Sequence, residues 1–144
     1  MKWGPAVEIL FWLALVAGGL AAAVALYGRY RVVPSILTGP QVCRLEAGGC
    51  QALFRTRAAA LVGLPNSALA VVLYLLLGIG VWAGWPTGSL LIGATLALAM
   101  SLYLAYYLIS NQLECRVCWT GHIANLIVWL TLLLKLLNEN AATT

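Results

Sequence analysis

Four long apolar runs constrain this chain more than any other feature. Hydrophobic residues make up 63% of the sequence and charged residues only 8%, and each run is close to the roughly 20 helical residues that cross a hydrocarbon core. Because backbone polar groups in lipid must be bonded internally, each run predicts a transmembrane helix. The runs are Ala6 to Tyr27, Ser67 to Trp85, Ser89 to Ile109 and Trp119 to Leu137. We therefore expect an all-α, multi-pass membrane protein with a single domain, residues 1–144, built as a four-helix bundle.

The connections between these runs differ greatly in length. A short turn around Pro86 joins the second and third runs, and the segment from Asn111 to Glu114 joins the third and fourth. The first and second runs are instead separated by residues 28–66, which we call the long connection. With four spans, the long connection and the segment before the fourth run lie on the same side of the membrane.

The second half of the long connection has a helical pattern of apolar residues. Leu53, Phe54, Ala58 and Leu61 recur at helical spacing, with two arginines among them. This pattern predicts a short amphipathic helix at the membrane interface, where it would cap the mouth of the bundle.

The four cysteines form two pairs on this same side. Cys43 and Cys50 lie in a glycine-containing part of the long connection, and Cys115 and Cys118 form a CxxC motif before the fourth run. Two intervening residues allow both sulfurs of a CxxC to lie on one helical turn, and the start of a helix favours the reactive thiolate. Arg116 adds a positive charge beside them. We therefore expect thiol–disulfide chemistry at the membrane surface.

Two other functions are compatible with four cysteines. Four thiolates can fill the tetrahedral shell of a structural zinc ion, but the six-residue gap between Cys43 and Cys50 is unusual for zinc and ordinary for a mobile shuttle loop. No metal site is therefore predicted. In a scaffold or a small-molecule channel the cysteines would be incidental. This interpretation is the weaker one, because two cysteine pairs converge on one face.

Three further polar residues lie near the starts of the second and fourth runs. His122 shares a helical face with Cys118, so its imidazole could hydrogen-bond a bound ligand or shuttle a proton. Asn66 could contact a ligand or cap the helix that begins at Ser67. Asn125, one turn beyond His122, is interpreted as a residue that joins helices.

Taken in order, these motifs resemble the vitamin K epoxide reductase family of membrane thiol oxidoreductases, over almost the whole chain. The animal enzymes carry a tyrosine where this chain has His122. A Dsb-type quinone reductase also has four spans and two cysteine pairs, but its CxxC lies in the first external loop, which is the reverse of the order here. The motifs that carry the resemblance are the pair Cys43 and Cys50, the segment Gly63-Leu64-Pro65-Asn66-Ser67, and Cys115-Arg116-Val117-Cys118 followed by Trp119-Thr120-Gly121-His122.

The resemblance implies an electron relay through the two pairs. A thioredoxin-like protein reduces the loop pair, in which Cys43 faces that partner and Cys50 exchanges with Cys115. Cys118 then faces a membrane quinone (ubiquinone, menaquinone or a related molecule), which is the electron-accepting substrate. Because no thioredoxin-like domain follows the fourth run, the partner is expected to be a separate chain, and no nucleic-acid partner is expected.

The resemblance also implies a quinone site beside the CxxC. Asn66 matches the family residue that hydrogen-bonds a quinone oxygen, and Ser67 lies next to it. We expect the quinone head to lie between Asn66 and His122, against the sulfur of Cys118.

The charges predict an inverted orientation in the cell membrane. Members of this family usually place their cysteines on the non-cytoplasmic side, whereas the positive-inside rule places the cysteine side of this chain in the cytoplasm. Lys2 and Lys135 lie on the opposite side. The arginines on the cysteine side are Arg29, Arg31, Arg44, Arg55, Arg57 and Arg116.

Overall fold

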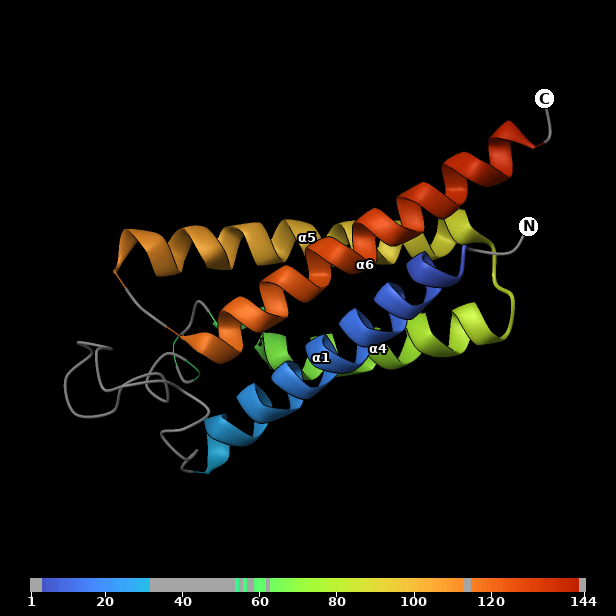
Figure 1. Cartoon of the computed structure of the whole chain (residues 1–144). Coiled ribbons are helices and arrows are strands. Elements are labelled where there is room, and N and C mark those ends of the chain that lie inside the picture. Colours follow the sequence, from blue (N-terminus) through green and yellow to red (C-terminus); the bar gives the residue numbers. More distant parts are fainter. Residues whose placement is uncertain are drawn as a thin grey trace.

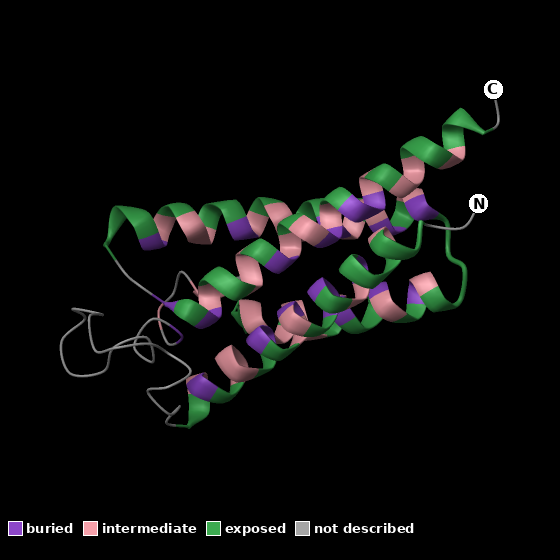
Figure 2. Cartoon of the chain, in the orientation of Figure 1, coloured by how far each residue is buried: buried purple, intermediate pink, exposed green. Residues whose placement is uncertain are grey.

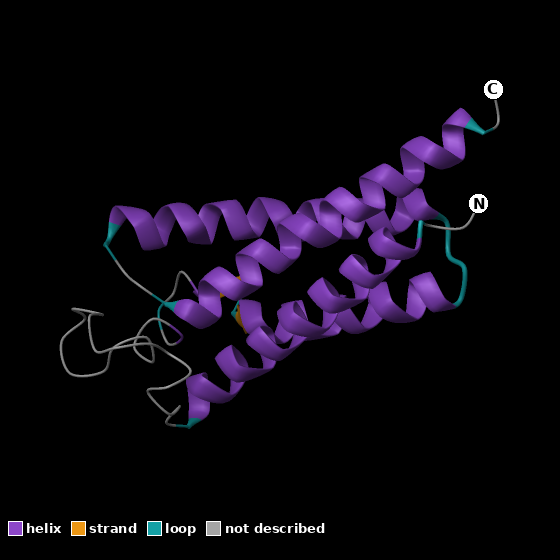
Figure 3. Ribbon diagram, in the orientation of Figure 1, coloured by secondary structure: helices purple, strands orange, loops and turns teal. Residues whose placement is uncertain are grey.

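The structure, a computed structural model, describes residues 4–31, 54, 56, 59–61, 63–112 and 115–142. Within these residues the chain forms a bundle of antiparallel helices (Figures 1 and 3), which confirms the predicted all-α fold. Cys43, Cys50 and most of the predicted interfacial helix lie outside the described residues. The helices are α1 (Pro5–Tyr30), α4 (Asn66–Trp82), α5 (Thr87–Ser110) and α6 (Arg116–Ala141).

Helices α1, α5 and α6 are each long and apolar enough to cross a membrane, whereas α4 is a shorter apolar helix of 17 residues. At about 1.5 Å per residue, α4 still spans about 26 Å, the lower end of what a bilayer requires. It ends at Trp82, three residues before the end of the predicted run. The helix ends here because Gly84 adopts a left-handed backbone conformation, with φ +72°. The amide of Trp85 then donates to the carbonyl of Gly80 at 2.8 Å, which is a common way for a helix to terminate.

Buried residues lie where the helices pack against one another, and exposed residues lie on their outer faces (Figure 2). Many of the exposed residues are large and apolar. Leu13 on α1, Leu96 on α5 and Ile123 on α6 are each more than half exposed, as expected of residues that face lipid rather than water. The buried residues of the central core are Phe11, Ala14, Leu15, Ala22, Tyr74, Leu77, Leu90, Ala94, Val128 and Leu132.

A two-residue hairpin leads into α4. Strand β1 (Ala60–Leu61) pairs antiparallel with strand β2 (Leu64–Pro65), and Gly63 in the turn has φ +81°. The prediction of a helix that reaches Leu61 is therefore wrong at its C-terminal end. A residue before proline is driven towards an extended backbone, so Leu64 extends the chain before α4 begins.

The described ends of the long connection lie at the same end of the bundle as the start of α6, as predicted (Figure 1). The C-terminal ends of α1 and α5 and the N-terminal ends of α4 and α6 meet on the left of Figure 1. We call this the cysteine end, because Cys115 lies there. Arg29, Arg31 and Arg116 belong to it.

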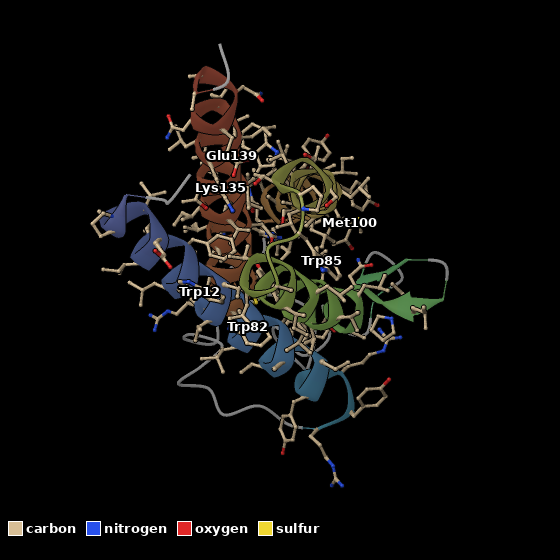
Figure 4. All side chains as sticks on the ribbon, turned by 90° about the vertical axis from the view of Figure 1, so that its right-hand side faces the viewer. Trp12, Trp82, Trp85, Met100, Lys135 and Glu139 are labelled. Atoms are coloured by element: carbon tan, nitrogen blue, oxygen red, sulfur yellow. The ribbon has the colours of Figure 1, made fainter. Side chains whose placement is uncertain are left out.

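At the far end, side chains link α5 to α6. The hydroxyl of Thr87, at the start of α5, donates to the carboxylate of Glu139 at 3.0 Å, and Lys135 lies 3.9 Å from the same oxygen. Figure 4 looks onto this end, with Lys135 and Glu139 on α6 and with Trp82 and Trp85 around the turn after α4. Trp82 is largely exposed, as is usual for tryptophan at a membrane–water interface.

Candidate functional site

The CxxC motif forms the start of α6. Cys115 is the N-cap residue, with an extended backbone, and its sulfur accepts a hydrogen bond from the amide of Cys118 at 3.3 Å. The two sulfur atoms lie 2.6 Å apart, so both cysteines occupy one helical turn as predicted. Amide donors and the positive end of the helix dipole both favour negative charge on Cys115.

Cys115 lies in a buried cluster that includes a residue of the long connection. Its exposed fraction is 1%, and it is buried in a cluster with Ala21, Phe54, Leu108 and Val117. Of this cluster, Phe54 comes from the long connection. The guanidinium of Arg29, in the last turn of α1, donates to the carbonyl of Phe54 at 3.0 Å. Phe54 therefore belongs to the same cluster as Cys115, and Arg29 links its backbone to the end of α1.

Cys118 faces an apolar cavity of about 390 Å³ between the helices. This volume is within the range of small-molecule sites, which are mostly apolar with a few placed polar groups. The predicted residues Asn66, Ser67 and His122 all line the same cavity as Cys118. Phe54 also lines it, so one aromatic ring contacts both the Cys115 cluster and the cavity.

The first turn of α4 supplies one wall of the cavity. Asn66 is the first residue of the helix, and Pro65 is its N-cap without a side-chain cap hydrogen bond. The alternative interpretation of Asn66 as the N-cap is therefore wrong. Instead, its side-chain oxygen Oδ1 is buried and the residue lines the cavity.

His122, which also lines the cavity, lies one turn after Cys118 on α6. Its Nε2 atom is buried and has no hydrogen-bond partner among the described residues. The imidazole meets the ring of Trp119 edge to face, with 6.0 Å between the ring centres. A buried polar atom without a partner is costly, and a ligand oxygen in the cavity would supply that partner.

Three of the residues that line the cavity form hydrogen bonds between helices. Only one of them was identified from the sequence. The hydroxyl of Tyr74 donates to Oδ1 of Asn125 at 2.6 Å, and Nδ2 of Asn125 donates to the hydroxyl of Ser101 at 2.6 Å. The prediction that Asn125 joins helices is confirmed. Tyr74 and Ser101 were missed, because an isolated tyrosine or serine in an apolar run carries no distinctive spacing.

The described residues contain no group of three or more His, Cys, Asp or Glu side chains placed to hold a metal ion.

The sequence matches the model of a known family. The model of the vitamin K epoxide reductase family matches residues 9–133, which is most of the chain. The chain belongs to the vitamin K epoxide reductase family. Neither the comparison with curated proteins nor that with solved structures gives a match. Membership in this family indicates a membrane thiol oxidoreductase, in agreement with the membrane-spanning helices and the CxxC motif at the start of α6.

If Phe54 covers Cys115, removing its ring should expose the thiol. We expect Phe54→Ala to increase the rate at which a water-soluble maleimide alkylates Cys115, measured by mass spectrometry of the protein in detergent. Phe54→Leu, which keeps an apolar cover, should stay close to the wild-type rate. Equal rates in all three proteins would show that other groups protect this sulfur.

Proposed function

We propose that this protein takes electrons from a separate thioredoxin-like protein and uses them to reduce a quinone dissolved in the membrane. The observation that carries the proposal is the position of the CxxC motif between two environments. Cys115 lies in one buried cluster with Phe54 of the long connection, while Cys118 lines an apolar cavity. A dithiol so placed can receive electrons from a cysteine of the long connection and deliver them to a lipid-soluble substrate.

The first half of the reaction is a series of thiol–disulfide exchanges. The dithiol of the partner reduces the disulfide between Cys43 and Cys50 and itself becomes a disulfide. The thiolate of Cys50 then attacks the sulfur of Cys115 in the Cys115–Cys118 disulfide, and Cys118 leaves as a thiolate. Attack by Cys43 on Cys50 releases Cys115, which restores the loop disulfide and leaves the CxxC motif reduced.

The second half transfers two electrons to the substrate. The thiolate of Cys118 attacks the quinone ring, and Cys115 then attacks the sulfur of Cys118. The Cys115–Cys118 disulfide re-forms and hydroquinone is released. The two sulfurs lose two electrons and the two thiols release two protons, which together convert a quinone to a hydroquinone without a metal or a flavin.

Asn66 and His122 are proposed to hold the quinone head, with Ser67 beside Asn66. They come from α4 and α6 and line the cavity together with Cys118, so a ring between them would lie against the sulfur. The buried Nε2 atom of His122 can hydrogen-bond one carbonyl oxygen of the ring. Hydrogen bonds at both oxygens would stabilise the negative charge that develops as the thiolate attacks.

The relay predicts distinct failures for its members. Cys118→Ala should abolish quinone reduction and accumulate a Cys50–Cys115 disulfide, because Cys115 can attack the loop disulfide at Cys50 and release Cys43, but no Cys118 thiol remains to displace Cys50 from Cys115. Cys43→Ala should lose turnover with a thioredoxin-like protein but keep some turnover with dithiothreitol, which can reach the CxxC motif directly. Quinone absorbance and mass mapping of disulfides would measure both.

A bridge between Cys43 and Cys115 would instead reverse the order of the loop cysteines. Stoichiometric bound zinc, with loss of folding on chelation, would favour the structural zinc site over the relay. Quinone reduction at the wild-type rate in Cys118→Ala would refute the proposed electron path.

The quinone site predicts that Asn66→Ala and His122→Ala affect catalysis more than folding. Losing a hydrogen bond to developing charge in a dry site costs about 10²-fold or more in rate, whereas losing an ordinary hydrogen bond costs about 1 kcal/mol of stability. We expect quinone reduction to slow by the former amount with little change in Tm, while thiol exchange at the loop pair continues normally.

Asn138→Ala provides the control, because Asn138 is an exposed amide near the far end of α6. It should leave quinone kinetics unchanged. Wild-type kinetics in both Asn66→Ala and His122→Ala would remove these residues from the site.

We further propose that the cysteine end faces the cytoplasm. Support comes from Arg29, Arg31 and Arg116 at that end and Lys135 towards the other, since basic residues favour the cytoplasmic side. In intact cells, a membrane-impermeant maleimide should then leave Cys43 and Cys50 unlabelled until the cells are permeabilised. A cysteine introduced by Asn138→Cys should be labelled without permeabilisation. The reverse pattern would establish the usual family orientation.

A further inference from the structure

Tyr74 links α4 directly to α6 and, through Asn125, to α5. Its hydroxyl donates to Asn125 of α6 at 2.6 Å and lies 3.5 Å from the carbonyl of Gly121. The side-chain amide of Asn125 in turn donates a hydrogen bond to the hydroxyl of Ser101 on α5, also at 2.6 Å. Tyr74 and Ser101 are each only 5% exposed, so lipid and water compete little for these hydrogen bonds.

Helix α1 has a glycine, Gly18, at the point where the ring of Tyr74 packs against it. A Cβ atom at Gly18 would overlap the hydroxyl and ring of Tyr74. At the neighbouring Gly19, an added Cβ would lie 3.8 Å from Tyr74, which is ordinary van der Waals contact. The position of the ring therefore depends on Gly18 in particular and not on a generally small-residue surface.

The contacts of Tyr74 on α6 lie on the same face as the reactive residues. Gly121 directly precedes His122, and Asn125 lies one turn beyond it, while Cys118 lies one turn before. Residues three and four apart share a helical face. Cys118, Gly121, His122 and Asn125 all line the cavity, so a contact that holds Gly121 and Asn125 also determines where Cys118 and His122 point.

We propose that Tyr74 is a positioning residue, which fixes the rotation of α6 so that Cys118 and His122 face the bound substrate. This inference rests on the proposed quinone reduction. It assigns to the Tyr74–Asn125–Ser101 network a role in the rate of reaction, beyond its contribution to helix packing. The quinone ring and the sulfur of Cys118 must approach closely for the thiolate to attack. If the sulfur is misplaced by about 1 Å, the rate can fall on the order of 10²-fold.

Tyr74→Phe is the direct test, because it removes the hydroxyl and keeps the ring in the Gly18 niche. We expect kcat for quinone reduction by dithiothreitol to fall by about 10- to 100-fold, with KM changed much less. Thr95→Val is the matched control. It removes a second hydrogen bond between α5 and α6, from Trp129 Nε1 to Thr95 Oγ1 at 2.9 Å, and neither of these residues lines the cavity.

Thr95→Val should lower Tm as much as Tyr74→Phe does while it retains wild-type kcat. Wild-type kcat in Tyr74→Phe would overturn the proposal. An equal loss of kcat in both variants would also overturn it, since the effect would then belong to helix packing in general.

A second pair of variants tests the same contact from α1. Gly18→Ala should displace the Tyr74 hydroxyl and reduce kcat as Tyr74→Phe does, whereas Gly19→Ala should behave as wild type. If both alanine variants of folded protein retained wild-type kcat, the Gly18 niche would have no part in positioning. If Gly18→Ala does not fold, the comparison of Tyr74→Phe with Thr95→Val decides alone.

One readout separates this inference from the proposed function. The rate at which lipid-soluble N-ethylmaleimide alkylates Cys118 reports the orientation of this side chain whether or not a quinone is reduced. A changed rate in Tyr74→Phe but not in Thr95→Val supports the positioning role, and an unchanged rate in both contradicts it. Absence of quinone reduction by the wild-type protein with intact cysteines would instead refute the proposed function.

Discussion

Backbone hydrogen bonding in lipid is the constraint on which this structure depends. No water is present to pair exposed amides and carbonyls, so each apolar run becomes a helix whose backbone is satisfied internally. Reactive polar groups are then confined to the ends of helices and to the space between them. Cys115 uses the first of these places, where the amide of Cys118 at the start of α6 donates to its sulfur. Cys118 and His122 lie in the space between the helices, about one and two turns further along α6.

Some polar groups that line the cavity bond one another, whereas a buried nitrogen of His122 has no partner among the residues that the structure describes. Tyr74, Asn125 and Ser101 bond one another across three helices, whereas Nε2 of His122 has no partner among the described residues. In an apolar interior a satisfied network stiffens the structure, and an unsatisfied atom is costly unless a ligand pairs it. The bonded network and the buried Nε2 atom of His122 thus lie on one face of α6, so the rotation of that helix determines the position of both.

Most of the fold could be predicted, because hydropathy alone locates a membrane helix. The runs matched the helices apart from their ends: the second run was extended to Trp85, although the left-handed Gly84 stops α4 at Trp82. The prediction also failed where local patterns compete. Leu61 fits a helical spacing with Phe54 and Ala58, yet Gly63 and Pro65 favour a hairpin there. Asn66 has the residue type of an N-cap, but Pro65 precedes it in the cap position.

The sequence by itself determined the membrane class, the helices and the single turn that holds both sulfurs of the CxxC motif, because each depends on residues close together in the chain. Only the tertiary structure decided that Phe54 packs in one cluster with Cys115, that Gly18 leaves room for the ring of Tyr74, and that Asn66 and His122 line one cavity with Cys118. These relations depend on the rotation and depth of each helix relative to its neighbours. Small differences in side-chain volume and a few buried hydrogen bonds determine this rotation and depth. The hydropathy of the sequence does not reveal either.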